Sequence, residues 1–187
     1  MRPSRRLAAA LAFACGAAAA EPMRVGSKRF TESYILGEIV AQTARAAGAR
    51  AEHRPGMGGT AILFQALRAG AIDVYPEYTG TIAKEILRLE GRPGIDELDR
   101  ALAPRGLGVG VPLGFNNSYA LAMREDRALA LGIRAISDLS AHPGLRLGLS
   151  PEFLGRADGW PGLRTAYRLP HATPAALDHG LAYEAIA

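Results

Sequence analysis

The segment at residues 72–81, IDVYPEYTGT, has the composition of a loop that contacts a ligand. Its apolar run stops at Pro76, and a glutamate, Tyr78, a glycine and two threonines follow at once. A strand should end at the proline, which has no N–H to donate within a sheet. A segment that only reversed the chain would not need a second aromatic residue. We interpret it as a strand that leads into a binding loop, although the periodicity alone favours a simply packed Tyr78.

The usual patterns of catalytic and metal-binding sites are missing from the sequence. The glycine-rich residues 56–60 lack the lysine and hydroxyl ending of a phosphate loop. Ser150 precedes a proline and is not part of a Gly-x-Ser-x-Gly pattern. The four histidines have no zinc-site spacing, so we expect them to be solvated surface residues: His53, His142, His171 and His179. We therefore predict a protein that is not an enzyme and uses no cofactor or metal.

The first twenty residues have the composition of a secretory signal peptide. Arginines precede an uncharged apolar run of 14 residues, which is shorter than the roughly 20 residues of a membrane span. Alanines at 18–20 offer a small-residue cleavage site before Glu21. Cys15, the only cysteine, lies in this segment, so the exported chain would have no disulfide. We predict a periplasmic protein, with a lipid anchor at Cys15 as the less favoured alternative.

The net charge gives no support for a nucleic-acid partner. The chain carries +4, but its first twenty residues hold three arginines and no acidic residue, which leaves +1 for the rest. Nucleic-acid-binding domains need a strongly basic face. The apolar fraction of 49% is sufficient for a packed globular core.

Alternating strand and helix patterns predict an α/β protein with parallel sheets covered on both faces. Apolar residues recur at helical spacing after Thr31, a candidate N-cap, and Thr60 is placed to cap the next helix. The predicted strands are 23–26, 51–54, 72–75, 118–123 and 145–149. The predicted helices are 32–47, 61–69, 82–89, 95–103, 137–139, 162–167 and one from 174 onward. The glycine-rich residues 108–114 are interpreted as a crossing segment.

Five blocks of the sequence resemble, in order, the substrate-binding proteins of osmoprotectant ABC transporters, which bind glycine betaine, carnitine and choline. The blocks are GSKRFTESYILGE at 26–38, GGTA at 58–61, DVYPEYTGT at 73–81, GFNNSYAL at 114–121 and SPEFLGRADGW at 150–160. The resemblance extends from about residue 24 to the end of the chain. No single block would be specific, but the set is.

The resemblance implies a type II periplasmic binding-protein fold, in which two α/β lobes close over a ligand around a hinge. We divide the chain into a signal peptide at 1–20, lobe I at 21–112 and a partial lobe II at 113–187. The final residues follow a helical pattern without a terminating residue. The family continues from there into another strand, a tyrosine-containing loop and a return to the first lobe. We therefore expect a fold that is incomplete at its C-terminus, and weak ligand binding.

The resemblance also assigns an aromatic cage. A quaternary ammonium carries its charge behind methyl groups and has no N–H to donate, so it is held by the negative faces of aromatic rings. Tyr78 in lobe I and Tyr119 in lobe II would contribute to the cage from opposite sides. Tyr75 and Trp160 are expected to be structural instead.

Four polar residues complete the predicted site. Lys28 and Arg156 would hold the carboxylate of a betaine-type ligand, as a point charge and as a planar fork of donors. Thr81 and Asn117 would be polar contacts near the ligand. Relatives can carry aspartate at the position of Asn117, and choline-restricted members carry it at the position of Thr81. The neutral residues here favour a betaine-type or broader ligand.

The implied function is capture of a quaternary-ammonium osmolyte and its delivery to a membrane permease with its ATPase. We expect a monomer that binds neither ATP nor nucleic acid. Two alternatives stay open: a sensory module that reports osmolyte levels, and a small-molecule enzyme on the same fold, since a fold does not fix a function.

Overall fold

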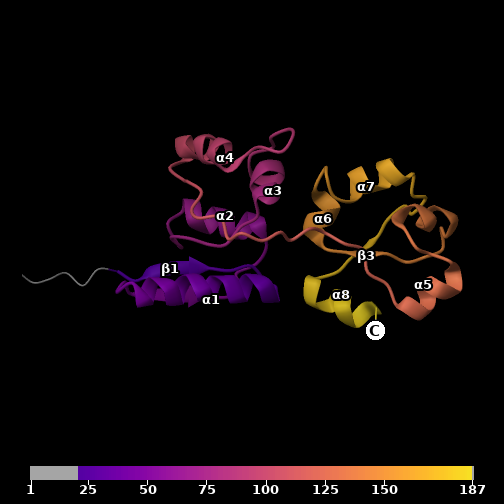
Figure 1. The fold of residues 1–187 in the computed structure, drawn as a ribbon, viewed down its shortest axis with the longest axis horizontal. Coiled ribbons are helices and arrows are strands. Elements are labelled where there is room, and N and C mark those ends of the chain that lie inside the picture. The colour runs from indigo at the N-terminus through magenta and orange to yellow at the C-terminus, as the bar shows by residue number, and fades with distance from the viewer. Residues whose placement is uncertain (1–20, 187) are drawn as a thin grey trace, which may run out of the picture.

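Two lobes joined by an extended segment make up the computed structural model, which describes residues 21–186 (Figure 1). Residues 23–105 hold the helices and strands of lobe I, and residues 125–186 hold those of lobe II. The extended segment between them contains no helix or strand from residue 107 to residue 124. The predicted signal peptide and Cys15 lie outside the described residues.

A small parallel sheet forms the centre of lobe I. Strand β1 (Met23–Gly26) pairs with strand β2 (Ala51–Arg54) in parallel, in a register that joins the first residue of each. Both strands have the predicted bounds. A parallel pair needs a crossover connection, which the intervening helix provides.

The third predicted strand, at 72–75, is reduced to a single parallel bridge between Val25 and Val74. The Asp73 carboxylate accepts the backbone N–H of Arg24 at 2.7 Å. That side-chain bond replaces one of the backbone bonds that a longer ladder would contain. The segment nevertheless follows β1 closely enough to deliver the turn after it to the lobe boundary.

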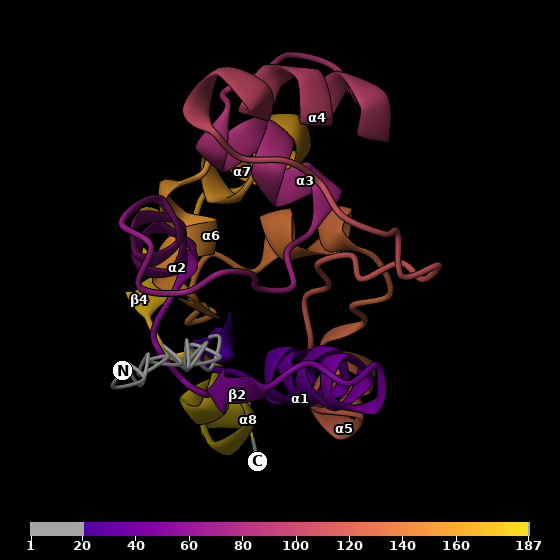
Figure 2. The ribbon, with the colours of Figure 1, turned by 90° about the vertical axis from the view of Figure 1, so that its left-hand side faces the viewer.

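Helices α1 (Thr31–Ala46) and α2 (Thr60–Arg68) lie on opposite sides of the sheet (Figures 1 and 2). Gly37 of α1 faces the β2 side of the sheet, where a Cβ would collide with a histidine side chain. Leu63 of α2 is fully buried against Gly26. The sheet is therefore covered on both faces, as predicted.

The predicted threonine caps of these helices are wrong. Phe30 and Gly59 precede the first helical residues, and neither helix has a side-chain cap from its N-cap residue. Thr31 and Thr60 are instead the first residues of their helices. The backbone N–H of Thr60 is satisfied by a carboxylate from lobe II, described below.

Lobe I ends in a second group of helical segments. These are α3 (Thr79–Thr81), η1 (Ile82–Ile86), α4 (Ile95–Leu102) and η2 (Ala103–Arg105). The segment η1 is π-helical, and with α3 it replaces the helix predicted at 82–89. Leu98 and Leu102 pack with Ile82 and Ala83 in a small core. This group lies at the end of lobe I opposite α1 (Figure 2).

Lobe II contains short elements around a second parallel pair of strands. They are α5 (Glu125–Leu131), η3 (Ile136–Ala141), β3 (Gly148–Leu149), α6 (Pro151–Gly155), α7 (Trp160–Tyr167), β4 (Ala175–Ala176) and α8 (His179–Ile186). Strands β3 and β4 pair in parallel. The predicted strand at 118–123 is wrong, because that stretch finds no strand to pair with. The helix predicted from 174 onward begins only at His179.

The error at 174 has a local cause. The backbone N–H groups of Ala175 and Leu177 donate to the carbonyls of Leu147 and Leu149 at 2.8 and 2.9 Å. These bonds tie the segment to β3 before the chain can turn into a helix.

Trp160 belongs to the core of lobe II, as predicted. Its side chain is 6% exposed and packs with four other buried residues: Leu139, Leu149, Phe153 and Leu169. Within residues 21–186, no helix combines the length and the apolar character that crossing a membrane would require.

Candidate functional site

The loop after β1 and the turn before α3 meet at a buried ion pair. Lys28 Nζ lies 2.6 Å from Glu77 Oε1 and donates to Thr60 Oγ1 at 2.8 Å. The two charged side chains are 4% and 6% exposed. The Ser33 hydroxyl accepts the backbone N–H of Lys28 at 2.8 Å, which fixes this loop. A ligand carboxylate would therefore have to share Lys28 with Glu77.

Tyr78 follows this ion pair directly in the chain. Its ring stacks on Phe30, with centroids 6.4 Å apart, and Lys28 Nζ lies 5.5 Å from its ring centre. Its hydroxyl donates a hydrogen bond to Glu32 Oε1 at 2.6 Å. Burial, and then the bond to Glu32, raise the pKa of Tyr78. The phenol therefore remains a protonated donor at neutral pH.

Tyr119 lies on the extended segment and is 60% exposed. Its ring packs against Phe153 with centroids 4.8 Å apart, and the Arg156 guanidinium carbon lies 5.8 Å from its ring centre. Arg156 is buried and donates from Nε and Nη2 to the two oxygens of Asp158 at 3.0 and 2.8 Å. The hydrogen bond to Arg156 lowers the pKa of Asp158.

Asn117 ties the extended segment to lobe I. Its Nδ2 donates to both Glu32 oxygens at 3.0 Å and lies 3.3 Å from the Tyr78 hydroxyl. Since Asn117 is two residues from Tyr119, this contact brings the extended segment that carries Tyr119 next to Tyr78 of lobe I.

Two further hydrogen bonds connect the lobes in the described chain. Arg156 Nη1 donates to Thr81 Oγ1 at 3.0 Å. The backbone N–H of Thr60 donates to Glu152 Oε1 at 2.6 Å, so a carboxylate of lobe II sits at the start of helix α2. Gly59 permits this approach, because a Cβ there would lie 2.5 Å from the same oxygen. A negative charge at a helix N-terminus is favourable.

Carboxylates outnumber cations along the lobe boundary. The acidic residues are Glu32, Glu77, Glu85, Glu152 and Asp158, and the cations in contact with them are Lys28 and Arg156. Burial raises the pKa of Glu77, against the opposing effect of Lys28, and burial also raises that of Glu85. The carboxyl groups supply hydrogen-bond acceptors for a polar or cationic group, while burial favours the neutral form of Glu77 and Glu85.

The six predicted site residues lie at the boundary between the lobes: Lys28, Tyr78 and Thr81 come from lobe I, Asn117 and Tyr119 from the extended segment, and Arg156 from lobe II. Tyr78 contacts Asn117, and Thr81 contacts Arg156, across the boundary. The two tyrosine rings each pack against a phenylalanine.

Three glutamates of this region were missed by sequence reasoning. Glu32, Glu77 and Glu152 lie inside the sequence blocks FTE, YPE and SPE that carry the family resemblance. Each makes a hydrogen bond with a residue of the predicted site or with a helix start beside it. Their position in those blocks was the signal that could have indicated a role at the site. Their hydrogen-bond partners could not be predicted, because most of them are far away in sequence.

The expectation of solvated surface histidines is wrong for His53 and His171. His53 is 9% exposed, with Nδ1 at 3.1 Å from Glu38 Oε2 and Nε2 at 2.8 Å from Ser27 Oγ. His171 is 6% exposed and its Nε2 lies 3.0 Å from the His142 carbonyl. Within residues 21–186, no three histidine, cysteine, aspartate or glutamate side chains are grouped to hold a metal ion.

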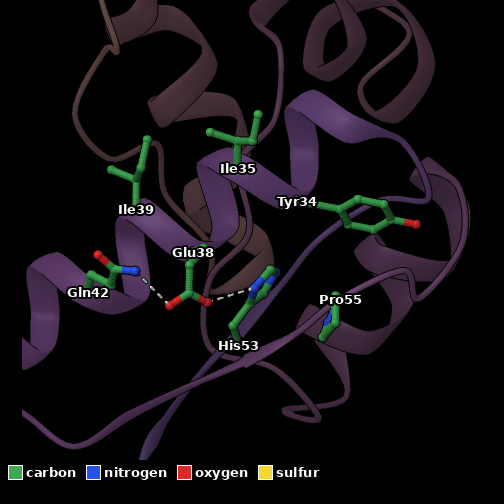
Figure 3. A pocket seen from close by; sticks show the side chains of 7 residues that line it. All are labelled: Tyr34, Ile35, Glu38, Ile39, Gln42, His53 and Pro55. Carbon is green, nitrogen blue, oxygen red and sulfur yellow. Dashed lines mark hydrogen bonds and ion pairs between the residues drawn. The ribbon is translucent and has the colours of Figure 1, made fainter.

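A separate surface hollow of about 530 Å³ lies along α1 and β2 (Figure 3). Tyr34, Ile35 and Ile39 line it, and none of the six predicted residues does. In Figure 3 the Glu38 carboxylate points toward both Gln42 and His53, which satisfies its polar groups internally. We do not assign the ligand to this hollow.

Comparison with known proteins places the chain in a family. Residues 21–187 match the family described as the substrate-binding domain of ABC-type glycine betaine transport systems. A glycine-betaine-binding protein of Pseudomonas aeruginosa is 36% identical, over 96% of this chain and 63% of that protein. The glycine betaine-binding protein YehZ of Escherichia coli is 29% identical, over 80% of this chain and 52% of YehZ. The ergothioneine transport permease/ergothioneine binding protein EgtU of Helicobacter pylori is 32% identical, over 88% of this chain and 31% of EgtU.

Solved structures agree with this placement. Apo YehZ from Escherichia coli aligns with a TM-score of 0.53 and 27% identity, over 89% of this chain and 65% of YehZ. A glycine betaine/carnitine/choline ABC transporter structure aligns with a TM-score of 0.60 at 20% identity, over 89% of this chain and 64% of that one.

The chain therefore belongs to the family of substrate-binding domains of ABC-type glycine betaine transport systems. The predicted two-lobed, type II periplasmic binding-protein fold is confirmed. The chain spans 63% and 52% of the length of the first two relatives.

Proposed function

We propose that this chain is the periplasmic substrate-binding component of an ABC importer for quaternary-ammonium osmolytes such as glycine betaine, carnitine and choline. The family supports a transport role, and the lobe boundary supports the ligand class. The observation that carries the proposal is the hydrogen bond from Asn117 to Tyr78, which places the segment that carries Tyr119 beside Tyr78. Two aromatic residues on facing lobes are what a methylated cation requires.

The surroundings of the two rings support a role in holding positive charge. Lys28 Nζ lies 5.5 Å from the Tyr78 ring centre, and the Arg156 guanidinium lies 5.8 Å from that of Tyr119. Each ring thus already interacts with a cation through its electron-rich face. A ligand ammonium would occupy the same kind of environment between them.

Two rings set a limit on the affinity. A cation over an aromatic face gains about 2 kcal/mol when water is excluded, so two rings contribute about 4 kcal/mol, which corresponds to a Kd of about 1 mM. The proposed site in this 187-residue chain is therefore a weak one. Lys28 and Arg156 would add specificity for a ligand carboxylate. That carboxylate would replace part of the bonding that Lys28 now makes with Glu77 and Arg156 with Asp158.

Ligand capture would close the lobes, because a ligand that touches both lobes binds the closed arrangement better than the open one. We propose the division that the family resemblance implies, with lobe I at residues 21–112 and lobe II at 113–187, which assigns Asn117 and Tyr119 to lobe II. The outer faces of the lobes would then contact a permease with its ATPase. The chain would be a monomer that is exported by the segment at 1–20. It would bind neither ATP nor nucleic acid and would catalyse no reaction.

The test is a titration of the 187-residue chain followed by NMR, which detects millimolar binding. The ligands are choline, glycine betaine, carnitine and, because of the relative EgtU, ergothioneine. The matched control is the neutral dimethylbutanol isostere of choline, which keeps the shape and lacks the charge. We expect a Kd of about 1 mM for at least one cation and at least about tenfold weaker binding of the isostere.

Equal binding of choline and its isostere would refute the cation cage, and micromolar affinity would contradict the two-ring estimate. Deletion of the chain's gene separates the transporter from a sensory module: a transporter component is needed for osmolyte uptake, whereas a sensor is not. Turnover of choline or betaine by the purified chain would favour an enzyme instead.

A further inference from the structure

Glu32 occupies a central position at the lobe boundary that no role above explains. It lies in the first turn of α1, where a negative charge is favourable. Its Oε1 accepts the Tyr78 hydroxyl at 2.6 Å, and both of its oxygens accept Asn117 Nδ2 at 3.0 Å. One carboxylate thus contacts a proposed cage residue of its own lobe and the facing lobe at the same time.

We propose that Glu32 is a positioning residue that orients the Tyr78 ring and couples it to lobe II through Asn117. The inference rests on the proposed function, since it takes Tyr78 as a cage residue. Glu32 contacts the proposed cage at the Tyr78 hydroxyl and would act on the ligand through that ring. Its removal should therefore affect ligand affinity and lobe contact together.

Two physical effects support this coupling. Hydrogen bonds to an ionised carboxylate are about twice as strong as neutral ones, so Glu32 fixes the phenol more firmly than an amide would. A phenol that donates to a carboxylate also has a more electron-rich ring, which strengthens its attraction for a cation. The stacking of Phe30 on Tyr78 restrains the ring from another side.

Glu38 provides a matched control on the same helix. Its carboxylate contacts Gln42, Arg45 and His53, all of them in lobe I. Glu38→Gln removes the same charge as Glu32→Gln without touching the lobe boundary. A general effect of net charge would appear in both variants, whereas a positioning effect would appear only in Glu32→Gln.

The experiment measures choline affinity by NMR titration and lobe separation by distance measurements between two spin labels. Labels are introduced at Gln65 and Leu129, exposed residues of lobe I and lobe II, in a Cys15→Ser chain. We expect Glu32→Gln to weaken choline binding about tenfold and to broaden the distribution of label-to-label distances in the ligand-free chain. Glu38→Gln should match the wild type in both measurements. In an Asn117→Ala background, Glu32→Gln should cost less, because the bond to Tyr78 is then the only one of these contacts left to lose.

An unchanged distance distribution in Glu32→Gln, or an equal loss of affinity with and without Asn117, would overturn the positioning role. Failure of the wild-type chain to bind any quaternary ammonium would instead refute the proposed function. The ligand-free distances would still decide whether Glu32 couples the lobes.

Discussion

At the scale of single residues, the two cations of the site are already paired within the protein. Lys28 is bound to Glu77, and Arg156 to Asp158 and Thr81. Such pairing keeps charged groups in a defined geometry where they are hidden from water. It also means that a ligand carboxylate has to compete with a protein carboxylate, which favours ligands that gain most of their affinity from the cationic end.

Replacing Lys28 by methionine should destabilise the chain by about 3–5 kcal/mol, because Glu77 would be left buried without its counter-charge. Denaturant unfolding at neutral pH measures this loss. The double variant Lys28→Met, Glu77→Leu should recover most of it, since neither charge is then buried. A single variant that unfolds at the wild-type denaturant concentration would show that the pair is not buried in solution.

The Arg156 pair should make part of the stability depend on acid. The pKa of Asp158 is held below its ordinary value of 3.8 by the hydrogen bond to Arg156. Its contribution is therefore complete above that value and is lost as the pH falls through the lower pKa of the folded state. The unfolding free energies of wild type and Asp158→Asn should differ at about pH 6 and converge as the pH falls below 3.8. A difference that stays constant over this range would contradict the assignment.

At the scale of elements, local sequence patterns predicted what depends on local physics. The bounds of β1 and β2 and the start of α4 at Ile95 agree with those predicted from the local sequence. The predicted threonine caps of α1 and α2 were wrong. At α2, the backbone N–H of Thr60 is satisfied by Glu152, which is 92 residues away. The strand predicted at 118–123 failed for the same reason: a strand needs a partner, and no local pattern supplies one.

Helix α1 offers a test of the close contact between helix and sheet. A Cβ at Gly37 would lie 2.6 Å from His53 Nε2, so Gly37→Ala should destabilise the chain by about 1–3 kcal/mol despite the better helix propensity of alanine. Gly80→Ala in α3 is the control, because nothing lies within 4 Å of the added atom. That variant should be neutral or up to about 1 kcal/mol more stable. Equal thermal midpoints would show that α1 does not pack this closely.

At the scale of the whole molecule, the candidate site depends on both lobes, and sequence reasoning reached it only in part. The family resemblance supplied the six residues, which lie at one lobe boundary. It did not supply the glutamates that hold them, because the bonds from Asn117 to Glu32 and from Thr60 to Glu152 join residues 85 and 92 positions apart. Hydrogen-bond partners across a lobe boundary are set by the tertiary arrangement, which spacing in the sequence does not encode.

The central claim is that Tyr78 and Tyr119 together hold a methylated cation, and choline affinity of their variants tests it most directly. NMR titrations would compare the wild type with Tyr78→Leu, Tyr119→Leu and the control Tyr167→Leu, which changes a tyrosine of α7 that is 41% exposed. Loss of either ring should weaken binding about tenfold or more, as expected for about 1.4–2 kcal/mol per ring, while the control binds as the wild type does. Unchanged choline affinity in Tyr78→Leu and Tyr119→Leu would contradict the account.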